Sequence, residues 1–356
     1  MLTTFFKSRI TKIIGVDIGS SSAKAVLLSK FNNTYKVEHV ANVDIPKGMI
    51  VDNDIVDVEV VGSIVKHLKK QFSTFNVDYA AAAVSGSGVI AKTVHINTVT
   101  SDEELAFQME IEAESSIPYP IDEVCIDFEV IQDNEEDKEK IDVLLVASRR
   151  ELVEKRTQAL EVGGFKAKII DIEGYALGRS IELVLHQLSA DEQKHPITLV
   201  DIGASMLTIT IVVEGDTVFV KEHDFGGEQY TQSIASHYGI SRDEAELAKV
   251  NNNLPPDHVT EVLFPFKTIL IQLLKRTLQI FSNDSGGDKV IKIMLSGGSS
   301  QIPKLVSSIE GELNIPCIQV KPFNDCKIEK LIDINELKST GMNYMMACGL
   351  ALRGFK

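Results

Sequence analysis

One acid, one glycine and three serines near the start of the chain have the composition of a phosphate-binding turn. They follow a short apolar run and comprise Asp17, Gly19, Ser20, Ser21 and Ser22. Glycine lets the main chain approach a ligand closely, and the N–H groups that follow can donate to phosphate oxygens. Asp17 could face a hydrated magnesium ion. Taken alone, the pattern also fits an ordinary hairpin with a tight turn.

The same pattern occurs again near residue 200. Asp201 and Gly203 follow an apolar run, Ala204 and Ser205 complete the turn, and another apolar run follows. Two such hairpins, far apart in the chain, indicate a duplicated architecture in which each half supplies one wall of a cleft. Asp17 and Asp201 could then hold one hydrated cation between the two halves.

Two further motifs contain residues that could approach a ligand. Gly297, Gly298 and Ser299 lie between a predicted strand and a predicted helix. Glu246 and Lys249 are three residues apart and therefore share one face of a predicted helix, where they form either a ligand contact or an exposed ion pair.

Lys24, two residues after the first turn, also has two interpretations. It could neutralise phosphate charge, or it could be a plain surface lysine.

Composition excludes several functional classes. The chain has 356 residues and a formal net charge of −15, which argues against nucleic acid because binding to phosphate backbones needs clustered Lys and Arg. Its four cysteines have no metal-binding spacing, so we expect reduced thiols, as in a cytosolic protein. No apolar stretch approaches the roughly 18 residues that a membrane span needs.

The order of predicted strands and helices indicates an α/β chain with an insert. We expect a first domain from residues 1–88, 167–196 and 340–356, and a second from 197–339, of which about 226–285 form a subdomain. Residues 89–166 are predicted to be an inserted α+β unit with the order strand, helix, strand, strand, helix.

Several predicted helices can be checked individually. Single helices are expected over 174–188 and 342–353. A longer helix is expected over roughly 257–282, with Pro265 as its start or a kink.

Two such hairpins with a late Gly-Gly turn resemble the ATPase superfamily of actin, Hsp70 and sugar kinases. The resemblance implies an actin-like two-domain fold with a duplicated ribonuclease H-like core, and binding of ATP with Mg²⁺. In such proteins a Glu and a Lys at a matching place reach ribose and adenine. The residues here that match the nucleotide motifs are Gly19, Ser20, Ser21, Ser22, Lys24, Gly203, Ala204, Ser205, Gly227, Glu246, Lys249, Gly297, Gly298 and Ser299.

The resemblance also suggests where a hydrolytic residue would stand. Members of the superfamily place a Glu or Gln on the connection between the domains, and here Glu173 is the first candidate and Asp171 the second. Gly174 stands where relatives often carry proline, which puts the placement of the carboxylate in doubt. Glu173 is equally explained as an acid favoured by a helix dipole, so we expect ATPase activity to be slow at most.

The insert resembles the extra subdomain of FtsA-like proteins, and within that branch the chain is similar to the PilM family of type IV pilus proteins. The matching residues include 117–120, 241–249 and 349–353. The resemblance implies a cytoplasmic protein held peripherally at the inner membrane. It also implies docking of the N-terminal peptide of a PilN-like membrane protein between the first domain and the insert, and communication with pilus motor ATPases.

Two alternatives of other classes stay open. An FtsA-type division protein would need a membrane-targeting amphipathic helix, whereas the sequence given ends at Lys356 directly after a helix rich in small residues. A small-molecule kinase of the same superfamily would need a catalytic base that faces a substrate pocket.

Overall fold

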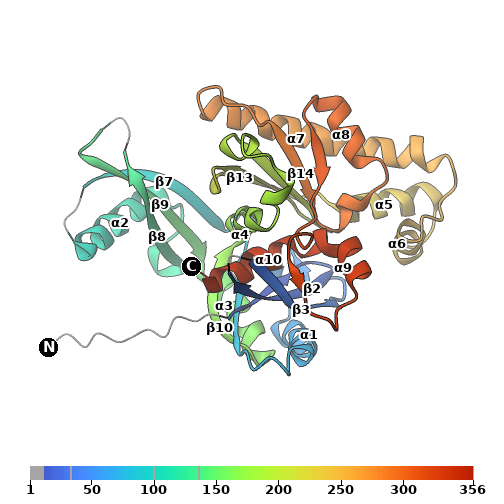
Figure 1. The fold of residues 1–356 in the computed structure, drawn as a ribbon, viewed down its shortest axis with the longest axis horizontal. Coiled ribbons are helices and arrows are strands. Elements are labelled where there is room, and N and C mark those ends of the chain that lie inside the picture. The colour runs from blue at the N-terminus through green and yellow to red at the C-terminus, as the bar shows by residue number, and fades with distance from the viewer. Residues whose placement is uncertain (1–11, 33, 99–100, 135–136, 356) are drawn as a thin grey trace.

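A computed structural model describes residues 12–32, 34–98, 101–134 and 137–355. The molecule has two halves, each built on a mixed sheet, and an arm that projects from the first half (Figure 1). Among the described residues, no helix combines the length and apolar character that a membrane crossing requires.

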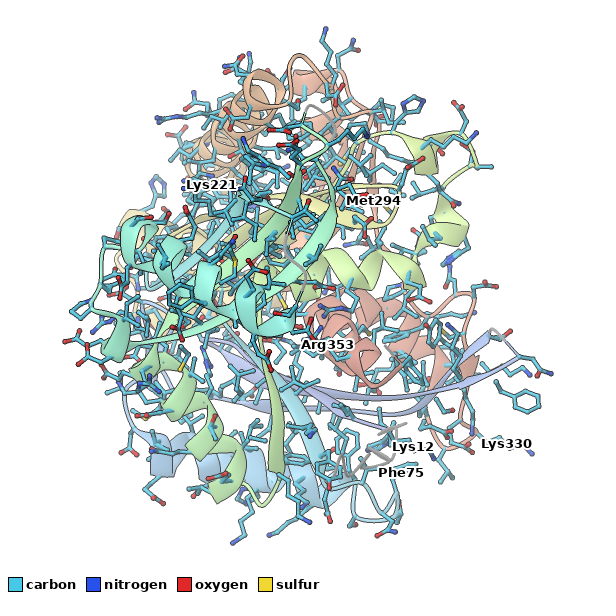
Figure 2. The ribbon with its side chains drawn as sticks, turned by 90° about the vertical axis from the view of Figure 1, so that its left-hand side faces the viewer. Lys12, Phe75, Lys221, Met294, Lys330 and Arg353 are labelled. Atoms are coloured by element: carbon cyan, nitrogen blue, oxygen red, sulfur yellow. The ribbon has the colours of Figure 1, made fainter. Side chains whose placement is uncertain are left out.

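The first half contains a six-stranded sheet in the order β10-β6-β1-β2-β3-β16. Its strands are β1 (Ile14–Ile18), β2 (Ser22–Phe31), β3 (Thr34–Asp44), β6 (Tyr79–Val84), β10 (Lys166–Ile172) and β16 (Lys327–Ile328). A two-stranded ribbon, β4 (Ile50–Val51) with β5 (Asp54–Ile55), follows β3. Lys330, just after β16, lies at the outer edge of this half (Figure 2).

Helix α1 (Val58–Gln71) covers one face of this sheet. Asp57 caps it by accepting a hydrogen bond from the Val60 N–H, a role for which Asp is among the preferred residues. Val61, Val65 and Leu68 point into a core that the sheet shares.

Helix α3 (Arg150–Val162) packs beside α1 and not on the insert's own core. Ala159 and Leu160 belong to the same buried cluster as Val65. Residues 89–166 were expected to form the insert, with this helix as its last element. We propose instead that the insert ends at Arg149, because α3 buries its apolar face in the first half.

The arm is a three-stranded sheet covered by one helix. The strands are β7 (Val89–Asn97), β8 (Val124–Asp133) and β9 (Lys140–Arg149), in the order β7-β9-β8. Helix α2 (Asp102–Ser116) is capped by Ser101, which accepts from the Glu104 N–H, and packs through Leu105, Met109 and Ala113. The arm therefore has a small core of its own.

The second half contains a five-stranded sheet in the order β13-β12-β11-β14-β15. The strands are β11 (Ile197–Ile202), β12 (Leu207–Val213), β13 (Asp216–His223), β14 (Lys292–Ser296) and β15 (Cys317–Gln319). This half also contains four helices, which are α5 (Gly227–Tyr238), α6 (Arg242–Val250), α7 (Phe264–Asp284) and α8 (Leu305–Leu313).

The long helix predicted from residue 257 begins later than expected. A π-helical turn spans Val259–Leu263, and regular α-helix starts only at Phe264. Pro265 lies in the first turn of α7, where its missing N–H removes no helical hydrogen bond. Pro265 is therefore a start and not a kink.

Two short helices join the halves, and both are shorter than predicted. The expected helix over 174–188 is α4 (Glu173–Arg179) followed by two 3₁₀ turns. The expected helix over 342–353 is α10 (Met345–Ala351) between 3₁₀ turns, and it follows α9 (Ile334–Thr340).

Glycines let these joining helices pack unusually closely. A side chain at Gly174 would collide with Val220 of β13, and one at Gly349 would collide with the Ala176 carbonyl of α4. The glycine in place of proline after Glu173 thus has a structural reason, because α4 lies directly on the second sheet.

Candidate functional site

The two acid-glycine hairpins have the same backbone construction. In the first, Gly19 N–H donates to the Ser22 carbonyl at 3.1 Å; in the second, Gly203 N–H donates to the Met206 carbonyl at 2.9 Å. Each aspartate is the last but one residue of the strand that leads into its turn, which is why the sequence signal is the same in both halves.

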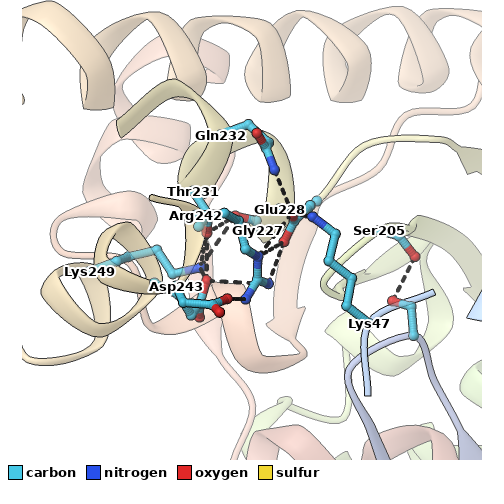
Figure 3. Close-up of polar contacts among 12 residues, drawn as sticks. Lys47, Ser205, Gly227, Glu228, Thr231, Gln232, Arg242, Asp243 and Lys249 are labelled. Carbon is cyan, nitrogen blue, oxygen red and sulfur yellow. Dashed lines mark hydrogen bonds and ion pairs between the residues drawn. The ribbon is translucent and has the colours of Figure 1, made fainter. Parts of the chain in front are cut away.

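The two turns meet across the junction of the halves. The Ser205 hydroxyl donates to the Ser20 hydroxyl at 2.8 Å (Figure 3). Residues 19–22 and 203–205 therefore lie side by side, and they do not point toward separate solvent faces.

A third segment, at the start of α5, joins the second turn. Gly227 N–H donates to the Gly203 carbonyl at 3.0 Å, and Glu228 N–H donates to the Ala204 carbonyl at 2.8 Å. The Ser299 hydroxyl donates to the same Gly203 carbonyl at 3.0 Å. Three segments distant in sequence thus converge on one turn.

The late Gly-Gly turn has the backbone that its sequence predicts. Gly297 has φ +82°, a conformation that residues with a side chain rarely adopt. A side chain added at Gly298 would meet no atom within 4 Å, so the space beside this residue is open. A flat ligand group can approach the main chain there.

Glu246 and Lys249 lie on one face of α6 and contact each other and α5. The Lys249 ammonium is 2.7 Å from the Glu246 carboxylate and donates to the Thr231 hydroxyl at 2.7 Å. It also donates to the Gly227 carbonyl at 3.3 Å, as Figure 3 shows. The pair is therefore attached to the same segment that joins the second turn.

An ion pair crosses between the halves beside these contacts. The Lys47 ammonium from the first half is 3.1 Å from Glu228 of α5, which Arg242 also contacts at 2.6 Å (Figure 3). Lys47 is 63% exposed, so this contact is screened by solvent and is weak.

The two aspartates have different electrostatic environments. Asp17 is 3.3 Å from the Lys24 ammonium, and both side chains are largely buried. Among contacts between described residues, Asp201 accepts a neutral hydrogen bond from the Ser296 hydroxyl at 2.8 Å and forms no ion pair. Burial raises the pKa of Asp201 to about 6, against the lowering effect of Ser296, and the nearby Asp17 carboxylate raises it further.

Glu173 begins α4 and is only partly exposed to solvent. Burial raises its pKa to about 8, and the Glu222 carboxylate raises it further, while Arg156 lowers it. At neutral pH the carboxyl group therefore carries a proton in most molecules, which makes it a poor general base in the absence of a ligand.

Asp171 is held in structural contacts away from this cluster. Its carboxylate pairs with Arg179 at 2.8 Å and lies 3.4 Å from the Arg353 side chain, and it also accepts from the Ile172 N–H. These partners position β10, α4 and the C-terminal turn relative to one another. They leave Glu173 as the stronger of the two catalytic candidates.

Two residues near the site were not predicted from sequence. Arg156 of α3 is 2% exposed and donates to the Ile18 and Asn53 carbonyls at 2.8 and 2.9 Å. Glu222 of β13 accepts from the Gly86 N–H at 2.7 Å and thereby ties the two halves together. Neither belongs to a motif, so only the packing of distant segments reveals them.

Comparison with known proteins gives a family match over nearly the whole chain. The model of a family described as "Type IV pilus assembly protein PilM" matches residues 15–355. Cell division protein FtsA of Bacillus subtilis (strain 168) is 23% identical over 259 residues, which is 66% of this chain. That match spans 57% of FtsA, so the chain aligns with little more than half of this relative.

Solved structures share the fold. A PilM–PilN type IV pilus biogenesis complex matches with a TM-score of 0.84 and 24% identity, over 98% of this chain and 99% of the other. The ethanolamine utilization protein EutJ from Carboxydothermus hydrogenoformans matches with 0.58 and 14%, over 96% and 89%. MreB5 of Spiroplasma citri, bound to ADP, matches with 0.50 and 14%, over 95% and 94%. The fold is therefore actin-like, as the sequence predicts.

Proposed function

The chain belongs to the PilM family of type IV pilus assembly proteins, and on that premise we propose that it binds ATP and acts in the pilus assembly platform at the cytoplasmic face of the inner membrane. The observation that carries the nucleotide part is the contact between the two turns, Ser20 to Ser205 at 2.8 Å. Two N–H-rich turns that touch across a domain junction can clamp a triphosphate from both sides.

The residues present fit a nucleotide with a divalent cation. Within the part of the chain that the structure describes, no cationic side chain contacts Asp201, and burial raises the pKa of its carboxyl group to about 6. A cation between Asp201 and Asp17 would favour the ionised form of both carboxylates. When bound, magnesium would supply positive charge to the phosphates, and Asp17 and Asp201 would hold it through water.

The remaining candidate residues divide into those proposed to bind the phosphates and those proposed to bind the adenosine group. The N–H groups of Ser20 to Ser22 and of Ala204 and Ser205 would donate to phosphates, with Lys24 close to Asp17. Gly19 and Gly203 would act by closing the two turns, because their own N–H groups donate to the Ser22 and Met206 carbonyls. The open space beside Gly298 and the Glu246–Lys249 face would receive the adenosine group. Gly227 links the two regions, since it donates to Gly203 and its carbonyl accepts from Lys249.

We propose that turnover is slow and that the protein works chiefly by holding nucleotide. Glu173 is the candidate that positions or deprotonates water, yet its pKa of about 8 keeps it protonated at neutral pH. Replacement Glu173→Gln should therefore preserve nucleotide affinity and reduce an already slow hydrolysis.

The partner in this proposal is the N-terminal peptide of a PilN-like membrane protein, bound between the first half and the arm. Helix α2 offers apolar side chains for such a peptide, since Phe107 and Ile111 are 62% and 53% exposed and lie one turn apart. Through this contact the protein would sit at the membrane and link the platform to pilus motor ATPases.

Calorimetry with the full chain tests the nucleotide part. We expect ATP to bind in the presence of magnesium and to bind weakly after chelation. Failure of the full-length chain to bind ATP with magnesium would refute this part of the proposal.

Co-purification tests the partner part separately. The parent chain should retain the cytoplasmic segment of its PilN-like partner. The double variant Phe107→Asp with Ile111→Asp should lose it. Val259→Asp, which changes a 50% exposed apolar residue of the second half, is the matched control and should retain it. Equal retention by all three proteins would remove α2 from the docking surface.

A further inference from the structure

One edge of the first sheet is left without a strand partner over much of its length. Strand β3 pairs with β2 along its whole length, but β16 covers its other side only at Lys36 and Val37. The Glu329 N–H adds one bond to the Val37 carbonyl. Among bonds between described residues, none continues along this edge from His39 to Asp44.

The backbone of this stretch points hydrogen-bonding groups outward. Ile45 N–H donates to the Ser21 carbonyl, which places residue 45 on the β2 side. Since main-chain groups alternate along a strand, those of Val40, Asn42 and Asp44 face the open edge. Exposed edges of this kind accept an additional strand.

A groove of about 450 Å³ follows this edge, and β3 forms one wall of it. The opposite wall is the segment that leads into α9, including Leu331, Asp333 and Glu336. Leu331 is 94% exposed and Ile334 is 48% exposed, so apolar surface lies beside the open edge. The insert is attached through β6 and β10 at the opposite end of the sheet, so this groove is separate from the proposed PilN surface.

His39 provides an independent indication that something is missing from the groove. Its side chain lines the groove, and its Nε2 atom is buried without a hydrogen-bond partner among the described residues. Phe75 stacks on the ring and Phe72 meets it in a T-shaped arrangement, and neither side chain can supply a conventional hydrogen-bond partner. A buried polar atom normally has a partner, and an occupant of the groove could provide it.

We propose that this groove binds an extended peptide segment of a partner protein, which adds a strand to β3. Asp333 and Glu336 line the groove, and Lys24, which also lines it, is paired with Asp17 at 3.3 Å. Together with the net charge of −15, these carboxylates favour a basic peptide. The exposed Leu331 favours apolar residues between the basic ones. In this binding mode, main-chain pairing supplies most of the affinity and side chains supply the specificity.

Hydrogen exchange on the full-length chain tests this inference directly. The probe is the synthetic peptide KVTVKVTR, in which valines alternate with lysine or threonine and an arginine ends the chain, and its charge-reversed form EVTVEVTE is the control. We expect the basic probe to slow exchange of the Val40, Asn42 and Asp44 amides about tenfold, with the control having no effect. No protection by the basic probe at about 1 mM would overturn the proposal.

Two pairs of variants separate strand addition from general attraction. Asn42→Pro removes an outward N–H and should lower probe affinity at least about tenfold, whereas Asn42→Ala should change it less than about threefold. Glu336→Lys should weaken binding of the basic probe, and Glu312→Lys, on the exposed surface of α8, should not. Equal effects within either pair would overturn the proposed mode.

Exchange without any peptide distinguishes the other occupants. Protection of the edge that rises with protein concentration would mean that a second copy covers it, which would overturn the proposal. Protection that is independent of concentration would mean that another segment of the same chain covers the edge. That result would also overturn the proposal. Because these measurements need no nucleotide, their outcome does not depend on the proposed ATP site.

Discussion

The two hairpins that face each other have the same backbone and different charge. In the first, Asp17 stands opposite Lys24 in the β1–β2 register; in the second, Asp201 stands opposite Thr208 in the β11–β12 register. One aspartate therefore has a cationic partner within its own hairpin, and the other has a neutral one.

This difference shows which half depends on an added cation. Burial raises the pKa of Asp201 to about 6. Lys24 lowers this pKa, but it belongs to the other hairpin. The first hairpin brings its own positive charge at 3.3 Å. We therefore expect the second hairpin to be the one whose binding chemistry depends most on magnesium.

The largest effect should come from removing the unneutralised acid. Asp201→Ala should lower affinity for magnesium-bound ATP about 100-fold, because a carboxylate that holds the hydrated cation is lost. The fold should be retained, since the change removes a buried charge. Calorimetry and thermal melting measure the two properties.

Asp216→Ala, at an exposed position that opens β13, is the matched control for this change. It should leave affinity unchanged. An Asp201→Ala protein that binds ATP as tightly as the parent would mean that the second hairpin holds no cation.

Making the first hairpin resemble the second should have a smaller effect. Lys24→Thr copies the residue found opposite Asp201 and leaves Asp17 without its partner. We expect ATP affinity to fall about tenfold and to depend more steeply on magnesium concentration. If affinity and magnesium dependence both stay unchanged, Lys24 is a purely structural partner of Asp17.

A still smaller effect is expected from pH. Asp201 is protonated below about pH 6, and a protonated carboxyl group holds a cation poorly, so ATP affinity should fall roughly fourfold between about pH 7 and 5.5. The stability of the ligand-free protein should change in the opposite direction, because an acid with a raised folded pKa loses stability as pH rises through that value.

Asp201→Asn should remove the contribution of this residue to both pH dependences. Titration calorimetry at several pH values, combined with chemical denaturation of the ligand-free chain, measures them. A pH dependence of affinity that persists in Asp201→Asn would assign it to another group.

The smallest effect should come from the contact between the turns. Ser205→Ala removes one hydroxyl-to-hydroxyl bond, and we expect about a twofold loss of ATP affinity. Because Ser20 is the partner in the same bond, Ser20→Ala and the double variant should show the same loss. Strictly additive losses in the double variant would mean that the two hydroxyls act separately.

Most of the local structure could be predicted from sequence. The two hairpins and the turn at Gly297 between a strand and a helical segment form from neighbouring residues, so local patterns were sufficient. The joining helices were predicted too long. Their close packing at Gly174 and Gly349 involves segments far away in the chain, which local patterns do not reveal.

The candidate site could be predicted only in part, because some of its residues come from segments far apart in the chain. The motif residues around Asp17 and Asp201 carry a local signal, whereas Arg156 and Glu222 reach the site from α3 and β13 without one. Asp171 has a favourable position in the sequence but an occupied carboxylate in the structure.

The sequence by itself determined that two similar turns exist and that each presents an aspartate after a buried strand, because strand periodicity and turn chemistry are properties of consecutive residues. Only the tertiary structure decided that the turns touch, and that among the described residues one aspartate has a cationic partner, the other has none, and one edge of a sheet is left uncovered. Those facts depend on burial and on distances between segments far apart in the chain, and no pattern of adjacent residues encodes them.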